Sequence, residues 1–249
     1  MLISFRDQKV LVTGGSRGIG KQIALLFIES GCNQIVVTGQ SKSIPDWITS
    51  FQKKSIEIQY HSMDLATTGW EDSFRKLVDE YDGFDVCVNN AGINSIHHLS
   101  EFPVDKIQEI LKVNLQSPII ISGIVSKKME KKQYGRIVNI ASIFGVVSKE
   151  KRSAYTASKS GLIGVTKTMA LDLASSKVLV NAVSPGFIET ELTERVLGEE
   201  GIAEMKQRIP LNRLGKPQEI ANYVLFLASD KNTYMTGQNI TVDGGFVCE

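Results

Sequence analysis

The chain has 249 residues, of which 42% are hydrophobic, so it can bury a sizeable core in one large domain or two small ones. Its 28 Lys and Arg residues nearly balance its 27 Asp and Glu residues, which argues against a nucleic-acid-binding or membrane-surface protein. No uncharged apolar stretch approaches the roughly 20 residues of a membrane-spanning helix. Arg6 and Asp7 interrupt the first apolar run too early for a signal peptide.

Cysteine and histidine usage points to a reduced protein without a structural metal. The three cysteines are far apart and form no CxxC pair, which favours free thiols in the cytoplasm. The three histidines, His61, His97 and His98, have no partners at ligand spacing, so we predict no metal site.

Short β-branched runs alternate with helical periods along the whole chain. The predicted strands, in chain order, are 9–13, 34–38, 56–64, 85–90, 136–142, 178–184 and 239–243. The predicted helices cover 18–30, a segment after Pro45, 69–81, 103–132, 153–174 and 218–229. Near-continuous apolar strands that alternate with helices are typical of a parallel sheet covered on both faces. We therefore predict an α/β fold: one doubly wound, Rossmann-like sheet of about seven parallel strands with helices on both faces.

The segment VLVTGGSRGIG places Gly14, Gly18 and Gly20 between the first strand and the first helix. Glycines there permit a tight turn and a close approach to a ligand, and the helix N-terminus offers free N–H groups to a pyrophosphate. The spacing is GxxxGxG rather than GxGxxG, and it also fits an ordinary strand–helix turn. It indicates a dinucleotide site only together with residues further along the chain.

The end of the second predicted strand bears on which dinucleotide is bound. An acid about 20 residues past the glycine turn would bind a ribose 2′-hydroxyl and repel a 2′-phosphate. Residues 38–40 (TGQ) occupy that place, and no acid occurs before Asp46. Arg17 and Lys42 either face a phosphate or are solvated surface charges. Mainly because the acid is missing, we predict NADP(H) over NAD(H).

Motifs in register along the chain resemble those of the short-chain dehydrogenase/reductase family. They are TGGSRGIG (13–20), Asp64, NNAG (89–92), VNL around Asn114, Ser142, YTASK (155–159), NAVSPGFIET (181–190) and TGQNITVDGG (236–245). The resemblance covers nearly the whole chain and is strongest to 3-oxoacyl-(acyl-carrier-protein) reductases and to sugar or polyol dehydrogenases. It implies an NAD(P)-dependent oxidoreductase acting on CH–OH groups, with one domain over 1–249 and a substrate-covering insertion over 186–216.

The resemblance also implies where the cofactor lies. Asp64 would meet the adenine ring, Asn90 would line the groove, and Ile188 and Thr190 would hold the nicotinamide end. A helix N-cap or an ordinary loop acid is the alternative interpretation of Asp64. The residues expected to contact the cofactor are Gly14, Ser16, Arg17, Gly18, Ile19, Gly20, Gln40, Asp64, Leu65, Asn90, Ala91, Gly92, Tyr155, Lys159, Pro185, Gly186, Ile188 and Thr190.

Tyr155 and Lys159 are the predicted centre of the chemistry. Residues at i and i+4 of a helix share a face, so both side chains can point into one cleft. Reduction of a carbonyl needs a proton donor that works near neutral pH, whereas a free phenol has a pKa of about 10. A neighbouring ammonium stabilises the phenolate, so we expect Lys159 to lower the pKa of Tyr155.

Ser142 ends the fifth predicted strand, where its hydroxyl can bond the substrate oxygen and stabilise developing negative charge. By resemblance, Lys159 also holds the nicotinamide ribose, and Asn114 anchors a water that links Lys159 to solvent. The predicted catalytic residues are Asn114, Ser142, Tyr155 and Lys159.

The predicted catalytic residues do not identify the substrate. Reductases of carrier-bound acyl chains typically present arginines to the acidic carrier, whereas Gln133 and Lys177 lie near those places here. Lys149, Lys151 and Arg152 follow the predicted catalytic serine and are consistent with a small anionic or sugar-derived substrate. Three functions remain: NADPH-dependent 3-oxoacyl thioester reduction, as in fatty acid biosynthesis; sugar, polyol or hydroxy-ketone dehydrogenation; and a non-catalytic NADP-binding sensor.

Two predicted helices are too apolar for the surface of a monomer. Segments 117–125 and 161–174 carry hydrophobic residues on more than one face. We expect self-association; the resemblance implies a homotetramer, and the sequence leaves a dimer open. The polar, glycine-punctuated segment 187–214 is expected to fold over the cleft and to become ordered when ligand binds.

Overall fold

The computed structural model describes residues 3–52 and 56–248. Within these residues, parallel strands form one seven-stranded sheet in the order β3-β2-β1-β4-β5-β6-β7. The strands are β1 (Lys9–Val12), β2 (Gln34–Gly39), β3 (Glu57–Ser62), β4 (Val86–Asn89), β5 (Gly135–Ile140), β6 (Val178–Pro185) and β7 (Asn239–Val242). The predicted doubly wound sheet is confirmed.

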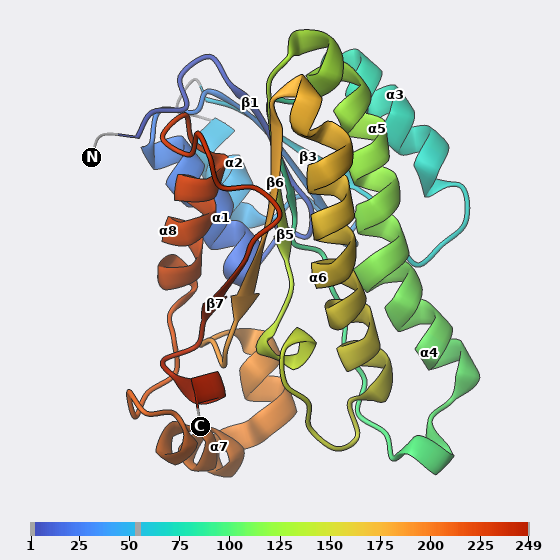
Figure 1. Ribbon diagram of the computed structural model, residues 1–249, viewed down its shortest axis with the longest axis vertical. Helices are drawn as coiled ribbons and strands as arrows, with labels where there is room; N and C mark the ends of the chain where they lie inside the picture. The colour runs from blue at the N-terminus through green and yellow to red at the C-terminus, as the bar shows by residue number, and fades with distance from the viewer. Residues whose placement is uncertain (1–2, 53–55, 249) are drawn as a thin grey trace.

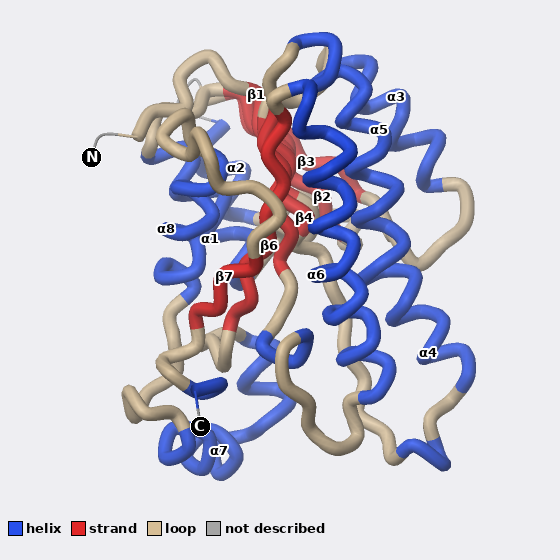
Figure 2. Tube along the Cα trace, viewed as in Figure 1, coloured by secondary structure: helices blue, strands red, loops and turns tan. Residues whose placement is uncertain are grey.

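Helices cover both faces of the sheet (Figure 1). They are α1 (Gly18–Glu29), α2 (Asp46–Gln52), α3 (Trp70–Glu80), α4 (Val104–Leu111), α5 (Ser117–Lys132), α6 (Ser153–Leu173), α7 (Glu191–Arg208) and α8 (Pro217–Ala228). Figure 2 shows the strands as a central layer, with α1 and α8 on one side and α3, α5 and α6 on the other. None of the described helices is long and apolar enough to cross a membrane.

Alternation along β1 explains why both faces carry a core. Val10 and Val12 pack with residues of α1 and α8, whereas Leu11 packs with residues of α3 and α5. β1 lies between β2 and β4, so the connections after β1 and β4 leave in opposite directions. In such sheets, ligands bind beyond the carboxyl ends of the strands at this switch point.

The structure differs from the predicted elements in two places that matter for the cleft. The helix predicted over 103–132 is divided by a π-helical turn, η2 (Lys112–Gln116), between α4 and α5. The polar, glycine-punctuated segment 187–214, for which no helix was predicted, contains α7, which is broken by a non-helical backbone at Gly198. Thr190 caps α7 by accepting a hydrogen bond from the Thr193 N–H at 3.2 Å.

Candidate active site

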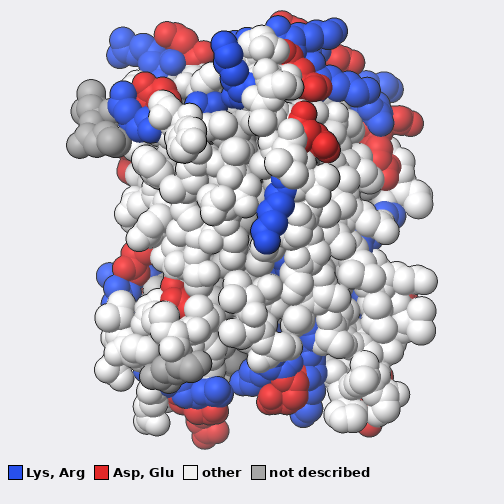
Figure 3. All heavy atoms as spheres, in the orientation of Figure 1, with Lys and Arg blue, Asp and Glu red and all other residues white. Residues whose placement is uncertain are grey.

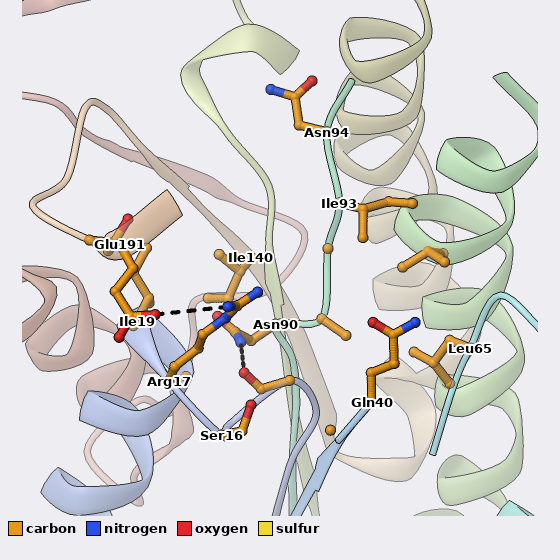
Figure 4. Close-up of a pocket in the computed structure, with 18 of the residues that line it drawn as sticks. Ser16, Arg17, Ile19, Gln40, Leu65, Asn90, Ile93, Asn94, Ile140 and Glu191 are labelled. Atoms are coloured by element: carbon orange, nitrogen blue, oxygen red, sulfur yellow. Dashed lines mark hydrogen bonds and ion pairs between the residues drawn. The ribbon is translucent and has the colours of Figure 1, made fainter. Parts of the chain in front are cut away.

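The turn between β1 and α1 is packed tightly against the end of β4. The Asn90 side chain donates a hydrogen bond to the carbonyl of Gly14 at 2.9 Å, and Thr13 Oγ1 accepts one from the Asn90 N–H at 3.0 Å (Figure 4). Gly14 has a φ of 62°, and a Cβ there would lie 2.7 Å from the Cα of Ala91. A Cβ on Gly20 would collide with the Asn90 side chain. Only glycines fit, so backbone rather than side chains faces the space beyond the turn.

A cleft of about 1000 Å³ opens at the carboxyl ends of the strands. Every residue predicted to contact the cofactor lines this cleft, and so does Ser142. Asn114 and Lys42 do not line it. α1 begins at the glycine turn without a side-chain cap, which leaves its first N–H groups for an anion. The glycine cradle and the helix start therefore fit a dinucleotide.

Gln40 and Asp64 lie together at the end of the cleft beyond β2 and β3. Gln40 Nε2 donates a hydrogen bond to Asp64 Oδ2 at 3.0 Å, and Asp64 Oδ1 accepts one from the Ala66 N–H at 2.9 Å. Asp64 thus stabilises the turn after β3, as the alternative interpretation expected, and it also lines the cleft; its contact with an adenine ring stays a prediction. Gln40 therefore presents an amide rather than a carboxylate to this end of the cleft.

Arg17 connects the glycine turn to the start of α7. Its guanidinium lies 3.8 Å from the carboxylate of Glu191, and both side chains are mostly exposed (Figure 4). Exposed ion pairs contribute little stability because water solvates both charges. Arg17 can therefore exchange Glu191 for a phosphate at small cost.

Ser142, Tyr155 and Lys159 meet on the wall of the cleft. The Ser142 hydroxyl lies near enough to the Tyr155 phenol to lower its pKa in part. Lys159 Nζ lies 5.8 Å from the centre of the Tyr155 ring and donates a hydrogen bond to the Ile140 carbonyl at 2.8 Å. The side chains from α6 and from the end of β5 converge, as the spacing predicted.

Burial dominates the ionisation of these groups. It raises the pKa of Tyr155, which the polar Ser142 side chain and the charge of Arg152 lower in part. It also lowers the pKa of Lys159 to about 8. The expectation that the pKa of Tyr155 is lowered is therefore wrong for the chain without ligands. The sequence indicates which charges are near the phenol, but it does not show how far the phenol is removed from water.

Asn114 lies behind the cleft on the π turn η2. Its fully buried side chain accepts a hydrogen bond from the Ile93 N–H at 2.8 Å and donates to the Ile93 carbonyl at 2.9 Å and to Ser158 Oγ at 3.2 Å. A Cβ on Gly92 would lie 3.5 Å from Asn114 Oδ1 and 3.6 Å from Lys159 Nζ. Asn114 thus fixes the loop after β4 beside Lys159; its contact with a water stays a prediction.

Sequence reasoning missed several residues of the cleft. They include Ile93, Asn94, Ile140, Glu191 and Thr193. Oδ1 of Asn94 is buried, and no hydrogen-bond partner for it occurs among residues 3–52 and 56–248. Ile93 and Asn94 directly follow the NNAG motif, so extending that motif would have found them. Glu191 and Thr193 belong to α7, which the sequence did not predict as a helix.

The described part of the chain contains no group of three or more His, Cys, Asp or Glu side chains placed to hold a metal ion.

Comparison with known sequences places this fold and site in one family. Residues 14–247 match the family described as "Enoyl-(Acyl carrier protein) reductase". The chain is 38% identical to a 3-oxoacyl-(acyl-carrier-protein) reductase of Aquifex aeolicus, covering 98% of this chain and 99% of the relative. It is 40% identical to the reductase of that name from Vibrio cholerae, covering 98% of each chain.

Solved structures are similar over the whole chain. A putative NAD(P)-dependent gluconate 5-dehydrogenase from Beutenbergia cavernae, with bound NADP, is 30% identical with a TM-score of 0.94 and full coverage of both chains. A gluconate 5-dehydrogenase from Burkholderia cenocepacia, in complex with NADP and tartrate, is 28% identical with a TM-score of 0.91, covering 100% of this chain and 99% of that one.

The fold and the site define a nicotinamide-dependent oxidoreductase acting on CH–OH groups. The chain belongs to the short-chain dehydrogenase/reductase family.

Proposed function

We propose that this protein uses NADPH to reduce a carbonyl to a secondary alcohol, with 3-oxoacyl thioesters as its first substrate class. The observation that carries the proposal is that Ser142, Tyr155 and Lys159 line one wall of the cleft, with Lys159 Nζ 5.8 Å from the centre of the Tyr155 ring. The relatives named as 3-oxoacyl-(acyl-carrier-protein) reductases, at 37–40% identity over nearly the full length, support the substrate class.

The bound cofactor supplies a hydride to the carbonyl carbon, and residues of the chain bind and protonate the carbonyl oxygen. Tyr155 donates its proton to that oxygen, and its raised pKa keeps the phenol protonated at neutral pH. Ser142 donates a hydrogen bond to the same oxygen and stabilises the negative charge that develops there. The Lys159 ammonium stabilises the phenolate left after proton transfer and holds the ribose hydroxyls. Asn114 keeps the adjoining loop in place beside Lys159.

The preference for NADP(H) over NAD(H) is part of this proposal. Gln40, rather than an acid, follows β2, and Arg17 borders the cleft with only a weak, exposed partner. A similar solved structure holds NADP, which supports the same choice. Lys42 lies outside the cleft lining and does not contribute.

The decisive experiment follows NADPH oxidation by the purified protein. The panel contains an acetoacetyl thioester, keto-sugars and neutral hydroxy-ketones. The proposal expects kcat/KM to be highest for the thioester. If the protein reduces keto-sugars or hydroxy-ketones but not the thioester, the proposed substrate class is wrong. If it binds NADPH tightly but reduces no compound of the panel, it is instead a non-catalytic NADP-binding sensor.

Dehydrogenation of a sugar, polyol or hydroxy-ketone is the second candidate. It is favoured by similarity to solved structures described as gluconate dehydrogenases and by the basic loop before α6. A silent NADP-binding sensor is least favoured, because Asn114, Ser142, Tyr155 and Lys159 are all present.

We propose that the protein acts in the cytoplasm as a homotetramer. Charged side chains gather at the top and bottom of the face in Figure 3, and the area between them, over α6, β7 and α8, is mostly uncharged. Leu171 on α6 is 80% exposed and Tyr234 is 96% exposed. Large exposed apolar side chains and a broad uncharged area of the surface favour burial against another copy. Light scattering distinguishes tetramer from dimer.

The insertion over 186–216 is proposed to cover the substrate. It contains α7, whose first turn borders the cleft through Glu191, Thr193 and Arg195. Hydrogen exchange of α7 that slows on addition of NADPH supports closure, whereas unchanged exchange contradicts it.

A further inference from the structure

Two aromatic side chains outside the cleft bind backbone carbonyls of residues that line it. Trp47 Nε1, on α2, donates a hydrogen bond to the carbonyl of Ser16 at 3.0 Å. The Tyr60 hydroxyl, on β3, donates one to the carbonyl of Ser41 at 2.7 Å. Both serines line the cleft, whereas neither aromatic residue does. Trp47 and Tyr60 therefore hold two segments of the cleft wall from behind.

The Trp47 side chain is itself held by packing. Its indole meets the Phe51 ring edge-on, with 6.5 Å between ring centroids, and packs against the core on the α1 side of the sheet. The next residue, Ile48, is fully buried, and its N–H donates a hydrogen bond to the Pro45 carbonyl at 2.9 Å at the start of α2. A donor on a packed ring loses little entropy when it forms a hydrogen bond.

The bond from Trp47 sets the direction of an N–H group in the glycine turn. In a planar trans peptide, the carbonyl of one residue and the N–H of the next point in opposite directions. The Ser16 carbonyl points toward α2, so the Arg17 N–H points away from α2. No acceptor for this N–H occurs among residues 3–52 and 56–248. Arg17 lines the cleft and directly precedes α1, where an anion is favoured.

Tyr60 holds the segment that follows β2. Gly39 makes its reach possible, since a Cβ on Gly39 would lie 2.8 Å from the Tyr60 hydroxyl oxygen. The residue that Tyr60 holds, Ser41, directly follows Gln40, and its Oγ accepts a hydrogen bond from the Ser43 N–H at 3.1 Å. In Rossmann-like folds, the region after this strand distinguishes a ribose 2′-hydroxyl from a 2′-phosphate. The loop that Tyr60 fixes should therefore affect NADP(H) more than NAD(H).

The two held segments lie against each other. The Gly15 N–H donates a hydrogen bond to the Thr38 carbonyl at 3.0 Å, and a Cβ on Gly39 would lie 3.2 Å from Ser16 Oγ. The glycine turn and the end of β2 thus form one continuous part of the cleft wall, with one aromatic donor behind each segment.

We propose that Trp47 and Tyr60 are positioning residues for the cofactor, each fixing one backbone segment of the dinucleotide site through a single hydrogen bond. Trp47 holds the glycine turn, which NADPH and NADH would both use, and Tyr60 holds the loop on the 2′-phosphate side. A segment that is already fixed loses less entropy when its ligand binds, so the loss of either bond weakens binding. This inference rests on the proposed use of NADP(H).

The test measures Kd for NADPH and for NADH by isothermal titration calorimetry, beside steady-state kinetics. Trp47→Phe and Tyr60→Phe each keep an aromatic ring and delete one donor. Trp47→Phe should raise Kd for both cofactors about 5- to 20-fold. Tyr60→Phe should raise Kd for NADPH about 5- to 20-fold and Kd for NADH by no more than about twofold. In both variants KM for NADPH should rise with Kd, while kcat at saturating NADPH stays within about twofold of the wild type.

Trp70→Phe is the matched control for Trp47→Phe. Trp70 is the other tryptophan of the chain, is buried, and packs into the core on the opposite face of the sheet. Its Nε1 has no hydrogen-bond partner among residues 3–52 and 56–248. The control therefore removes the same part of an indole without removing a hydrogen bond, and Kd for both cofactors should stay within about twofold of the wild type.

The results separate this inference from the proposed function. Unchanged Kd in Trp47→Phe, or an equal rise in Trp70→Phe, would overturn the role of Trp47, and equal effects of Tyr60→Phe on the two cofactors would overturn that of Tyr60. A fall in kcat with Kd unchanged would overturn the inference as well. A wild type that binds NADPH, with the expected effects of both substitutions, but reduces no carbonyl overturns the proposed function alone. A wild type that binds neither cofactor overturns both.

Discussion

Lys159 Nζ donates a hydrogen bond to the backbone carbonyl of Ile140 at 2.8 Å, which ties α6 to the end of β5. The bond holds the ammonium at the floor of the cleft, 5.8 Å from the centre of the Tyr155 ring. Because Lys159 is 4% exposed, its charge is held there against the preference of a cation for water. The site therefore keeps a poised cation before any ligand binds, and this cation has consequences for pH dependence and for stability.

The pH dependence of kcat/KM for NADPH should report Lys159, because this parameter reflects ionisations of the unliganded enzyme. Burial lowers the pKa of Lys159 to about 8, while the pKa of Tyr155 is raised. As pH rises through about 8, the ammonium loses its proton and the phenol keeps its own. We expect kcat/KM to be level at neutral pH and to fall above about pH 8. A profile that stays level well above that pH contradicts the assignment.

Replacement of Lys159 by Met should stabilise the folded protein and remove its activity. Unfolded lysine titrates near 10.5 and folded Lys159 near 8, so at neutral pH the charged folded state carries the cost of burial. Lys159→Met should raise the free energy of unfolding at neutral pH by about 1–3 kcal/mol, after loss of the bond to Ile140, and abolish turnover.

The sign of the linkage gives this prediction a control. Between about pH 8 and 10.5 the unfolded state binds more protons than the folded state, so the wild type gains stability as pH rises. The advantage of Lys159→Met should therefore shrink in urea titrations at alkaline pH. A variant that is less stable than the wild type at neutral pH refutes the account.

Asn114 should matter for folding as well as for turnover. Asn114→Ala leaves the Ile93 N–H and carbonyl without their partner behind the cleft. We expect a loss of about 2–4 kcal/mol in the free energy of unfolding, together with reduced kcat. Ser158→Ala removes the 3.2 Å contact to Asn114 Nδ2 and the 2.7 Å bond that Ser158 Oγ donates to the Tyr155 carbonyl, but it leaves both bonds to Ile93, so it should cost less. Equal losses in the two variants would mean that Ile93 is held by other groups.

Gln40 should control the choice of cofactor. Gln40→Asp places a carboxylate where the 2′-phosphate of NADPH is expected. The control, Gln40→Asn, has a side chain of the same size as aspartate but keeps a neutral amide. The ratio of kcat/KM for NADPH over NADH should fall at least about tenfold in Gln40→Asp and little in Gln40→Asn. A wild type that already prefers NADH would refute the assignment.

The parts of the site that the sequence predicted are those encoded locally. Gly14, Gly18 and Gly20 lie close together where β1 leads into α1, and Tyr155 and Lys159 lie one helical turn apart, so spacing alone brings their groups together. The alternation of apolar strands and helices likewise encodes the order of layers without reference to distant residues.

Contacts between distant segments could not be read from the sequence. The bond from Lys159 to Ile140, the position of Asn114 behind Ile93 and the burial of Arg152 each depend on how separate segments pack. Burial reverses the expected direction of the pKa of Tyr155 for this reason. α7 was missed because Gly198 and the neighbouring polar residues conceal its helical period.

The most direct test of the account is the turnover of Tyr155→Phe, which deletes a single oxygen from the wall of the cleft. Initial rates of NADPH oxidation with an acetoacetyl thioester would be compared with those of the wild type, beside fluorescence titrations of NADPH binding. The account predicts a fall in kcat of about 100-fold or more with cofactor affinity and folding retained. Turnover near that of the wild type in this variant would contradict the role of Tyr155 as the proton donor.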